Sequence, residues 1–340
     1  MVWVPNRMAQ WLLLTQLAWV QPWQPLYGAC LERCVTEGCN NCKVMTARLA
    51  HDSGDIRGTV FFLPGRSGIL LAREPSLHQF YNLGFNVYTL DWRGQGESSR
   101  TLEDSHKVHI EAFESYLEDL CALKLRARVD KAPQPWLLVG SSMGGHMALR
   151  LMEEAPDGLS GAILVAPMLD VHTGFIPRSV APMVAAMLRK LGLGERYAPG
   201  YGPYDLAGDR FEGNQSTRDP ARYAEQKRFL REHPEYVTGG VTVSWADEVF
   251  KSMDRANDPG RLAKVTAPVL MLNAGDDRVV DSSAAHIVAE RLPHCREIVI
   301  PGARHNLFAE TDDAQAIVWG EINLFLDQVA PAHTSKAAAS

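Results

Sequence analysis

The chain has 340 residues, and 46% of them are hydrophobic, which is enough to bury one large core. The formal net charge is −6 and basic residues form no cluster, so nucleic acid is not an expected partner. An aromatic content of 8% with dispersed glycines argues against a disordered chain.

The first 29 residues carry features of an export signal. An apolar run over 8–20 follows Arg7; it is too short to span a membrane and has the length of a signal-peptide core. Pro22 ends this run, and small residues precede Cys30 as they do at a lipoprotein cleavage site. Segment 1–29 is therefore expected to direct export, to lie at a membrane surface, or to be an extension without a role. An exported or membrane-associated location is favoured over a cytoplasmic one.

Segment 30–56 is a cysteine-rich extension. Four cysteines fall within 13 residues: Cys30, Cys34, Cys39 and Cys42. In an exported protein they could form two disulfides, and in a reducing compartment they could bind zinc. Cys121 and Cys295 stand in or beside core elements and are expected to be free thiols.

Apolar runs alternate with helical patterns over 57–167 and again over 264–330. The strands are expected at 58–63, 86–90, 136–140, 161–166, 268–274 and 297–300. The helices are expected at 75–83, 110–128, 145–154, 283–292 and 313–329. This order predicts an α/β protein with a mostly parallel central sheet and helices on both faces. The small, polar tail 331–340 is expected to be disordered.

Segment 168–263 interrupts the alternation and is expected to form a helical cap over the carboxyl ends of the strands. It contains an apolar helical segment at 180–188, a charged segment at 219–235 and a further run at 243–250. Met183, Met187 and Leu188 would suit a groove for an acyl chain, because methionine adapts to flexible apolar ligands. They could equally pack the cap onto the sheet.

A Gly-Ser-Ser-Met-Gly pentapeptide, 140–144, stands between an expected strand and an expected helix. A G-x-S-x-G run in this setting is the nucleophile elbow of α/β-hydrolases, in which the central serine stands on a strained turn. Its glycines avoid collisions between the strand and the helix. The pattern marks Ser142 as a nucleophile.

A serine nucleophile needs a general base and an acid that orients the base. In this fold the three follow the order Ser, Asp, His along the chain. Asp276 and Asp277 follow the strand 268–274, and His305 follows the strand 297–300. Either aspartate could be the acid, while Asp281 is expected to cap the next helix.

The oxyanion of an acyl-transfer intermediate needs two N–H donors. Met143 directly follows the nucleophile, and its backbone N–H is one candidate. The second is expected in the loop after strand 58–63, where Arg66 supplies a backbone N–H.

These motifs resemble the lysophospholipase and monoglyceride lipase branch of the α/β-hydrolases, which is classed with the serine aminopeptidases. The matching runs are 62–66, 89–98, 139–145, 274–281 and 302–305. The Asp-Trp-Arg-Gly-Gln-Gly run at 91–96 is similar to bacterial lysophospholipases. The acid of many such enzymes stands in an Asp-Arg-Val-Val run, which favours Asp277. Monoglyceride lipases carry His-Gly where this chain has Pro64 and Gly65, a form that again resembles the lysophospholipases.

The resemblance implies a serine hydrolase of lipid esters, a lysophospholipase or monoacylglycerol lipase with lysophospholipid or monoacylglycerol as substrate and with peripheral membrane contact. The acyl-enzyme mechanism calls for no metal and no cofactor. A general carboxylesterase and an aminopeptidase-like peptidase stay open, the latter with Asp247 or Glu248 holding a substrate ammonium. A non-catalytic binding protein on the same scaffold is a further alternative.

Overall fold

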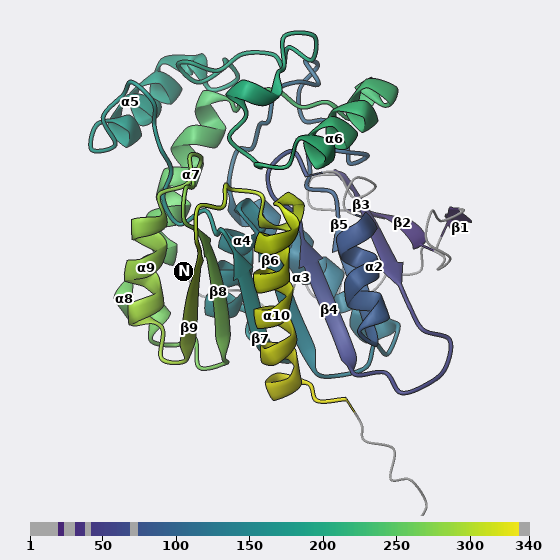
Figure 1. Ribbon diagram of the computed structural model, residues 1–340. Coiled ribbons are helices and arrows are strands. Elements are labelled where there is room, and N and C mark those ends of the chain that lie inside the picture. Colours follow the sequence, from purple (N-terminus) through teal and green to yellow (C-terminus); the bar gives the residue numbers. More distant parts are fainter. Residues whose placement is uncertain (1–19, 24–30, 38–41, 69–73, 333–340) are drawn as a thin grey trace, which may run out of the picture.

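The central element of the computed structural model is a nine-stranded sheet formed by the described residues, which are 20–23, 31–37, 42–68 and 74–332 (Figure 1). The strand order is β1-β2-β3-β5-β4-β6-β7-β8-β9. The strands are β1 (Val20–Trp23), β2 (Leu31–Glu37), β3 (Lys43–Leu49), β4 (Gly58–Leu63), β5 (Phe85–Leu90), β6 (Trp136–Ser141), β7 (Leu159–Val165), β8 (Val269–Ala274) and β9 (Cys295–Ile300).

The strands from β5 to β9 pair in parallel and carry the expected mostly parallel sheet. Strands β4, β5, β6 and β8 are buried along their whole length. A strand buried on both faces needs apolar side chains at successive positions, which is why these strands appear in the sequence as continuous apolar runs.

The segment 30–56 was not expected to add strands, yet it extends this sheet. Strand β2 pairs antiparallel with β3, and β3 pairs antiparallel with β5. From segment 1–29 the structure describes only 20–23, which form the edge strand β1 beside β2. Cys30 and Cys39 lie outside the described residues. The predicted disulfides or zinc site of the four-cysteine cluster therefore lie in part outside the described chain. Cys121 and Cys295 are free, partly buried thiols, as expected.

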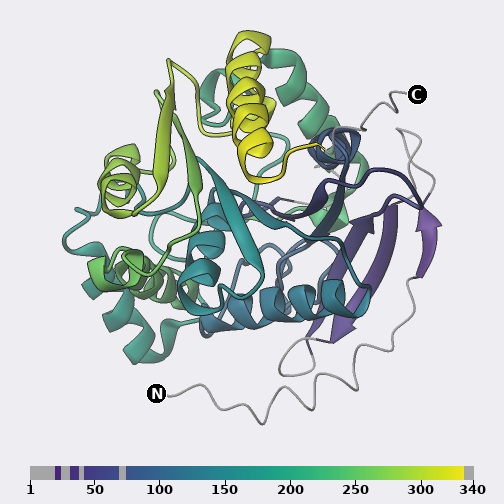
Figure 2. The same ribbon diagram turned by 90° about the horizontal axis from the view of Figure 1, so that it is seen from below.

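Helices cover both faces of the sheet (Figure 2). The helices of this part of the chain are α2 (Glu74–Asn82), α3 (Glu114–Val129), α4 (Met143–Glu154), α9 (Ser282–Arg291) and α10 (Asp312–Val329). Alternate residues of β4 point to opposite sides, Phe61 into a core packed by α3 and α4 and Phe62 into a core packed by α2 and α10. Asp281 caps α9 by accepting the N–H of Ser283, as predicted.

The segment between β7 and β8 is largely helical and projects beyond one end of the sheet (Figure 1). Its elements are α5 (Ala181–Leu188), the π-helical turn η4 (Arg189–Leu193), η5 (Phe211–Gly213), α6 (Pro220–Glu232), η6 (Pro234–Tyr236), α7 (Val243–Ala256) and α8 (Pro259–Leu262). Met183 and Met187 are 69% and 55% exposed, so these two side chains do not pack the segment onto the sheet. Across the described residues, no helix has the length and apolar character to cross a membrane.

Candidate active site

Ser142 stands at a sharp turn between β6 and α4. Its backbone has φ 52° and ψ −116°, a conformation that costs a non-glycine residue free energy and recurs at functional sites. Close packing surrounds the turn. A Cβ at Gly140 would lie 2.3 Å from the carbonyl oxygen of Gly144, and a Cβ at Gly144 would lie 2.0 Å from that of Leu63. The two glycines are therefore what lets strand and helix meet at Ser142.

Three side chains are hydrogen-bonded in series at this turn. The His305 Nε2 atom lies 2.9 Å from Ser142 Oγ, and His305 Nδ1 lies 2.8 Å from Asp277 Oδ2. Because an ionised carboxylate only accepts, His305 must donate its Nδ1–H to Asp277, which leaves Nε2 free to accept the serine hydroxyl proton. All three predicted residues meet, although Ser142 and His305 are 163 positions apart.

Asp277 is held in its charged form by its surroundings. Its side chain is 1% exposed, and Oδ1 accepts the backbone N–H groups of Val279 and Val280 at 2.8 and 3.0 Å. Burial alone would raise the pKa of Asp277, but the hydrogen bonds from His305 and from these N–H groups outweigh it and lower the pKa. Asp276 instead forms an exposed ion pair with Arg278 at 2.8 Å. Only Asp277 reaches the histidine.

The loop after β4 lies against the serine. A Cβ on Gly65 would be 3.2 Å from Ser142 Cβ and 3.9 Å from its Oγ. Gly68 donates to the carbonyl of Gly65 at 3.0 Å, which closes a turn with Arg66 at its second position and its N–H unused by that turn. Met143 is the first residue of α4, so its N–H has no acceptor within the helix. The two residues expected to supply donors therefore belong to the helix start and the loop that meet at Ser142.

Two residues that sequence reasoning did not single out hold this loop in place. Trp92 Nε1 donates to the carbonyl of Pro64 at 2.7 Å, and Gln95 Oε1 accepts the N–H of Ser67 at 2.6 Å. Both side chains are fully buried. Ser67 has φ 59°, so the loop adopts a conformation that a serine rarely takes unless its surroundings enforce it. The run 91–96 thus supports the loop 64–68.

A buried carboxylate, Glu310, organises the histidine loop and was also missed. Its side chain is 0% exposed and accepts the backbone N–H groups of Arg304, Arg218 and Thr311 at 2.9, 3.0 and 3.0 Å. The segment 214–218 adds contacts, since Asn306 donates its N–H to the carbonyl of Ser216 at 2.7 Å. A glutamate in a loop carries no sequence signal for such a role, because its partners come from two distant segments.

The arrangement can pass a proton from the Ser142 hydroxyl to an imidazole whose tautomer and orientation are fixed by the Asp277 carboxylate. This is the equipment for acyl transfer. Within the described part of the chain, no three His, Cys, Asp or Glu side chains are grouped so that they could hold a metal ion.

Residues 54–312 match the family model described as serine aminopeptidase, S33, which covers most of the chain. The chain belongs to the S33 family. Solved structures related to this S33 chain include a monoglyceride lipase from Saccharomyces cerevisiae, which is 19% identical with a TM-score of 0.72 over 92% of this chain and 99% of that one. A carboxyl esterase from Bacillus coagulans is 18% identical, with a TM-score of 0.71 over 88% and 99%. These likenesses show the α/β-hydrolase fold.

Curated relatives of this S33 chain are named for lipid hydrolysis. A probable lysophospholipase L2 from Haemophilus influenzae is 27% identical over 85% of this chain and 90% of its own length. Lysophospholipase L2 from Escherichia coli is 28% identical over 76% and 77%. A monoacylglycerol lipase from Mycolicibacterium smegmatis is 27% identical over 76% and 84%. The chain is therefore an S33 α/β-hydrolase of the lipase and lysophospholipase kind.

Proposed function

We propose that the chain is a serine esterase that hydrolyses single-chain lipid esters, either lysophospholipids or monoacylglycerols, through an acyl-enzyme on Ser142. The observation that carries the proposal is the hydrogen-bonded series from Ser142 through His305 to Asp277. The names of the relatives direct the substrate toward lipids.

In the proposed reaction Ser142 attacks the ester carbonyl while His305 takes the hydroxyl proton. The N–H groups of Met143 and Arg66 stabilise the oxyanion, and His305 then protonates the leaving alcohol. A water molecule deprotonated by His305 attacks the acyl-serine in turn and releases the fatty acid. Asp277 stabilises the charged imidazole in both steps. Neither step needs a metal or an organic cofactor.

We also propose that the helical cap meets the lipid surface from which the substrate comes. Four large apolar side chains of 175–191 are strongly exposed: Phe175, Met183, Met187 and Leu191, at 78%, 69%, 55% and 67%. Exposed apolar patches mark contacts with membranes or partners. Binding of the protein to lipid vesicles should weaken when Met183 and Met187 are replaced by serine, with hydrolysis of a water-soluble ester as the control.

An aminopeptidase-like activity needs an acidic group free to hold a substrate ammonium. Asp247 and Glu248 are already paired, each with both Arg189 and Lys251. Since their charge is compensated, neither residue is a ready partner for a substrate cation. The lipid ester function is therefore preferred.

The test is fatty-acid release from a lysophospholipid and a monoacylglycerol of equal chain length. The wild type should release fatty acid from at least one of them. Ser142→Ala should lower kcat by about 10⁴-fold or more, by analogy with measured triads, whereas Ser141→Ala on the adjacent position should not. Absence of release from both lipids, with cleavage of a proline naphthylamide, would replace this function by a peptidase. Failure of a fluorophosphonate to label Ser142 would leave only a binding protein.

A further inference from the structure

The side chain of Arg66 has an unusual position for a cation. It extends from the loop beside Ser142 toward the cap, where Nη1 donates to the carbonyl of Gly239 at 3.1 Å and lies 3.4 Å from Ser67 Oγ. The residue is partly buried. Among the described residues it forms no ion pair, and the charged or titratable groups close to it are the hydroxyls of Tyr201 and Tyr116.

Two other arginines near the site have a carboxylate partner, whereas the Arg304 side chain next to His305 donates only to the carbonyls of Asn214 and Thr217. Arg93 makes a bidentate pair with buried Asp119 at 2.7 and 2.5 Å, and Arg218 pairs with Glu310 at 3.1 Å. A buried or half-buried cation without a counter-ion is costly, and burial accordingly lowers the pKa of Arg66. The Arg66 guanidinium has no counter-ion and belongs to the loop beside Ser142, so it is a candidate for pairing with an anionic group of the substrate.

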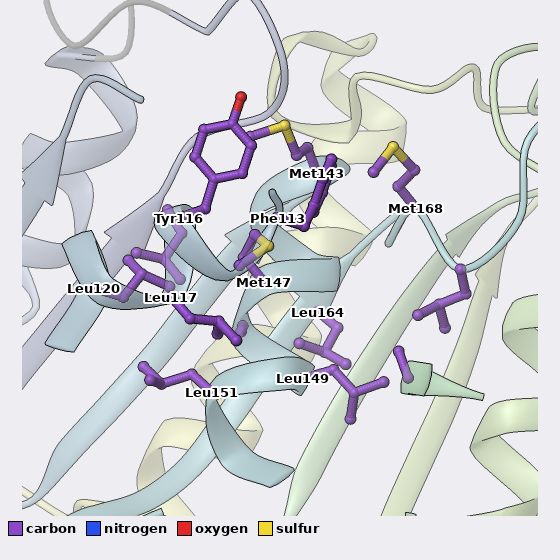
Figure 3. Packing of buried hydrophobic residues seen from close by; sticks show 14 of the residues in the cluster. Phe113, Tyr116, Leu117, Leu120, Met143, Met147, Leu149, Leu151, Leu164 and Met168 are labelled. Carbon is purple, nitrogen blue, oxygen red and sulfur yellow. The ribbon is translucent and has the colours of Figure 1, made fainter. Parts of the chain in front are cut away.

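A second, independent observation concerns three buried polar atoms next to this arginine. Gln95 Nε2, Tyr116 Oη and Trp245 Nε1 form no hydrogen bond of regular geometry. Gln95 Nε2 and Trp245 Nε1 both face the Tyr116 oxygen, which can accept from them, so the Tyr116 hydroxyl hydrogen is the one left without an acceptor. The Tyr116 hydroxyl lies beside the side chain of Met143 (Figure 3).

This cluster has more donor hydrogens than acceptors, because the Tyr116 oxygen is the acceptor that both the Gln95 amide and the Trp245 indole approach. An amide nitrogen and an indole nitrogen can only donate, a guanidinium only donates, and a tyrosine hydroxyl can do so. A buried donor without an acceptor costs free energy. A ligand with anionic oxygens would supply the missing acceptors and would therefore bind favourably here. A neutral glycerol would offer far weaker acceptors.

We propose that Arg66 binds the phosphate of the substrate, with the donors Gln95, Tyr116 and Trp245 behind it, and so selects monoacyl glycerophospholipids over monoacylglycerols. The inference rests on the proposed lipid esterase function and names its substrate class. In a lysophospholipid the glycerol backbone separates the scissile carbonyl from the phosphate by a length similar to that of an arginine side chain. The backbone N–H of Arg66 can thus serve the oxyanion while its guanidinium holds the phosphate.

The test compares kcat/KM for oleoyl lysophosphatidylethanolamine and monooleoylglycerol in the same detergent micelles. Arg66→Gln should lower the ratio of the two values by about 10- to 100-fold, the worth of a hydrogen bond to a charged group. Arg66→Lys should lower it less, because lysine keeps the charge but loses the planar fork. Arg278→Gln, which removes an exposed arginine at the same end of the sheet, is the matched control. A shift below about threefold in Arg66→Gln, or an equal shift in Arg278→Gln, would overturn the proposal.

A second measurement separates this inference from the lipid function itself. Glycerol phosphate should competitively inhibit hydrolysis of the neutral ester p-nitrophenyl butyrate, and Arg66→Gln should weaken that inhibition by a similar factor. If inorganic phosphate inhibits as strongly as glycerol phosphate, the site binds free anion and the assignment to a lipid headgroup is wrong. If neither lipid is cleaved by the wild type, the proposed function fails, while the inhibition experiment still tests Arg66.

Discussion

Replacing Asp277 by asparagine should abolish most of the activity for a reason that can be read from its hydrogen bonds. Oδ1 accepts two backbone N–H groups, from Val279 and Val280, and Oδ2 faces His305 Nδ1. In Asp277→Asn the amide oxygen must keep the position that faces two donors, so the NH₂ group turns toward the histidine. His305 then has to carry its proton on Nε2, where it can no longer accept the proton of Ser142. A loss of about 10⁴-fold in kcat, equivalent to about 5.4 kcal/mol, is expected.

The matched control is the neighbouring residue. Asp276→Asn removes only an exposed ion pair with Arg278 and should change kcat by less than about twofold. Both variants would be assayed with p-nitrophenyl butyrate, with thermal unfolding measured alongside to show that each is folded. A folded Asp277→Asn protein that keeps more than about a tenth of the wild-type kcat would refute the tautomer argument. Equal losses in the two variants would refute the assignment of Asp277.

Two further predictions concern stability. Gly144→Ala should destabilise the protein by about 3 kcal/mol, because its Cβ would lie 2.0 Å from the Leu63 carbonyl oxygen. Gly320 lies on the exposed face of helix α10, where a Cβ would meet nothing within 4 Å, so Gly320→Ala should stabilise the protein by about 0.5–1 kcal/mol. Denaturant unfolding of the pair would check both signs. Burial lowers the pKa of His146 from 6.5 to about 3. Below pH 6.5 His146 is therefore protonated in the unfolded chain but stays neutral in the folded one. Stability should fall by about 1.4 kcal/mol per pH unit from this group as the pH drops toward 3, and urea unfolding of His146→Gln should lack that slope.

The strands that could be predicted from the sequence are those buried on both faces. Strands β4 and β8 are continuous apolar runs that only the middle of a parallel sheet accommodates. Strand β3 has no continuous apolar run, because Lys43, Thr46 and Arg48 stand between its apolar residues. Such a short strand with polar interruptions is indistinguishable from a polar extension until its partner strands are known. For this reason segment 30–56 was not expected to join the sheet.

The residues that meet at the candidate site could be predicted because local motifs mark Ser142 and strand ends mark Asp277 and His305. The choice between Asp276 and Asp277 needed the structure or the resemblance, because adjacent residues point in opposite directions. The supports Trp92, Gln95 and Glu310 were not predictable. Their hydrogen bonds join segments that lie far apart in the chain, and nothing in the local pattern encodes such partners.

The hydrogen bonds between segment 214–218 and the loop 304–310, which carries His305, limit which parts of this protein can be exchanged for those of a relative. Arg218 and Arg304 both donate their backbone N–H groups to Glu310, and Thr217 Oγ1 donates to the carbonyl of Ala309 at 2.5 Å. A cap taken from a relative would replace residues 214–218 and so remove their hydrogen bonds to the loop 304–310. The position of His305 would then change along with the substrate preference. Chimaeric proteins should therefore take the loop 304–310 and the cap from the same parent.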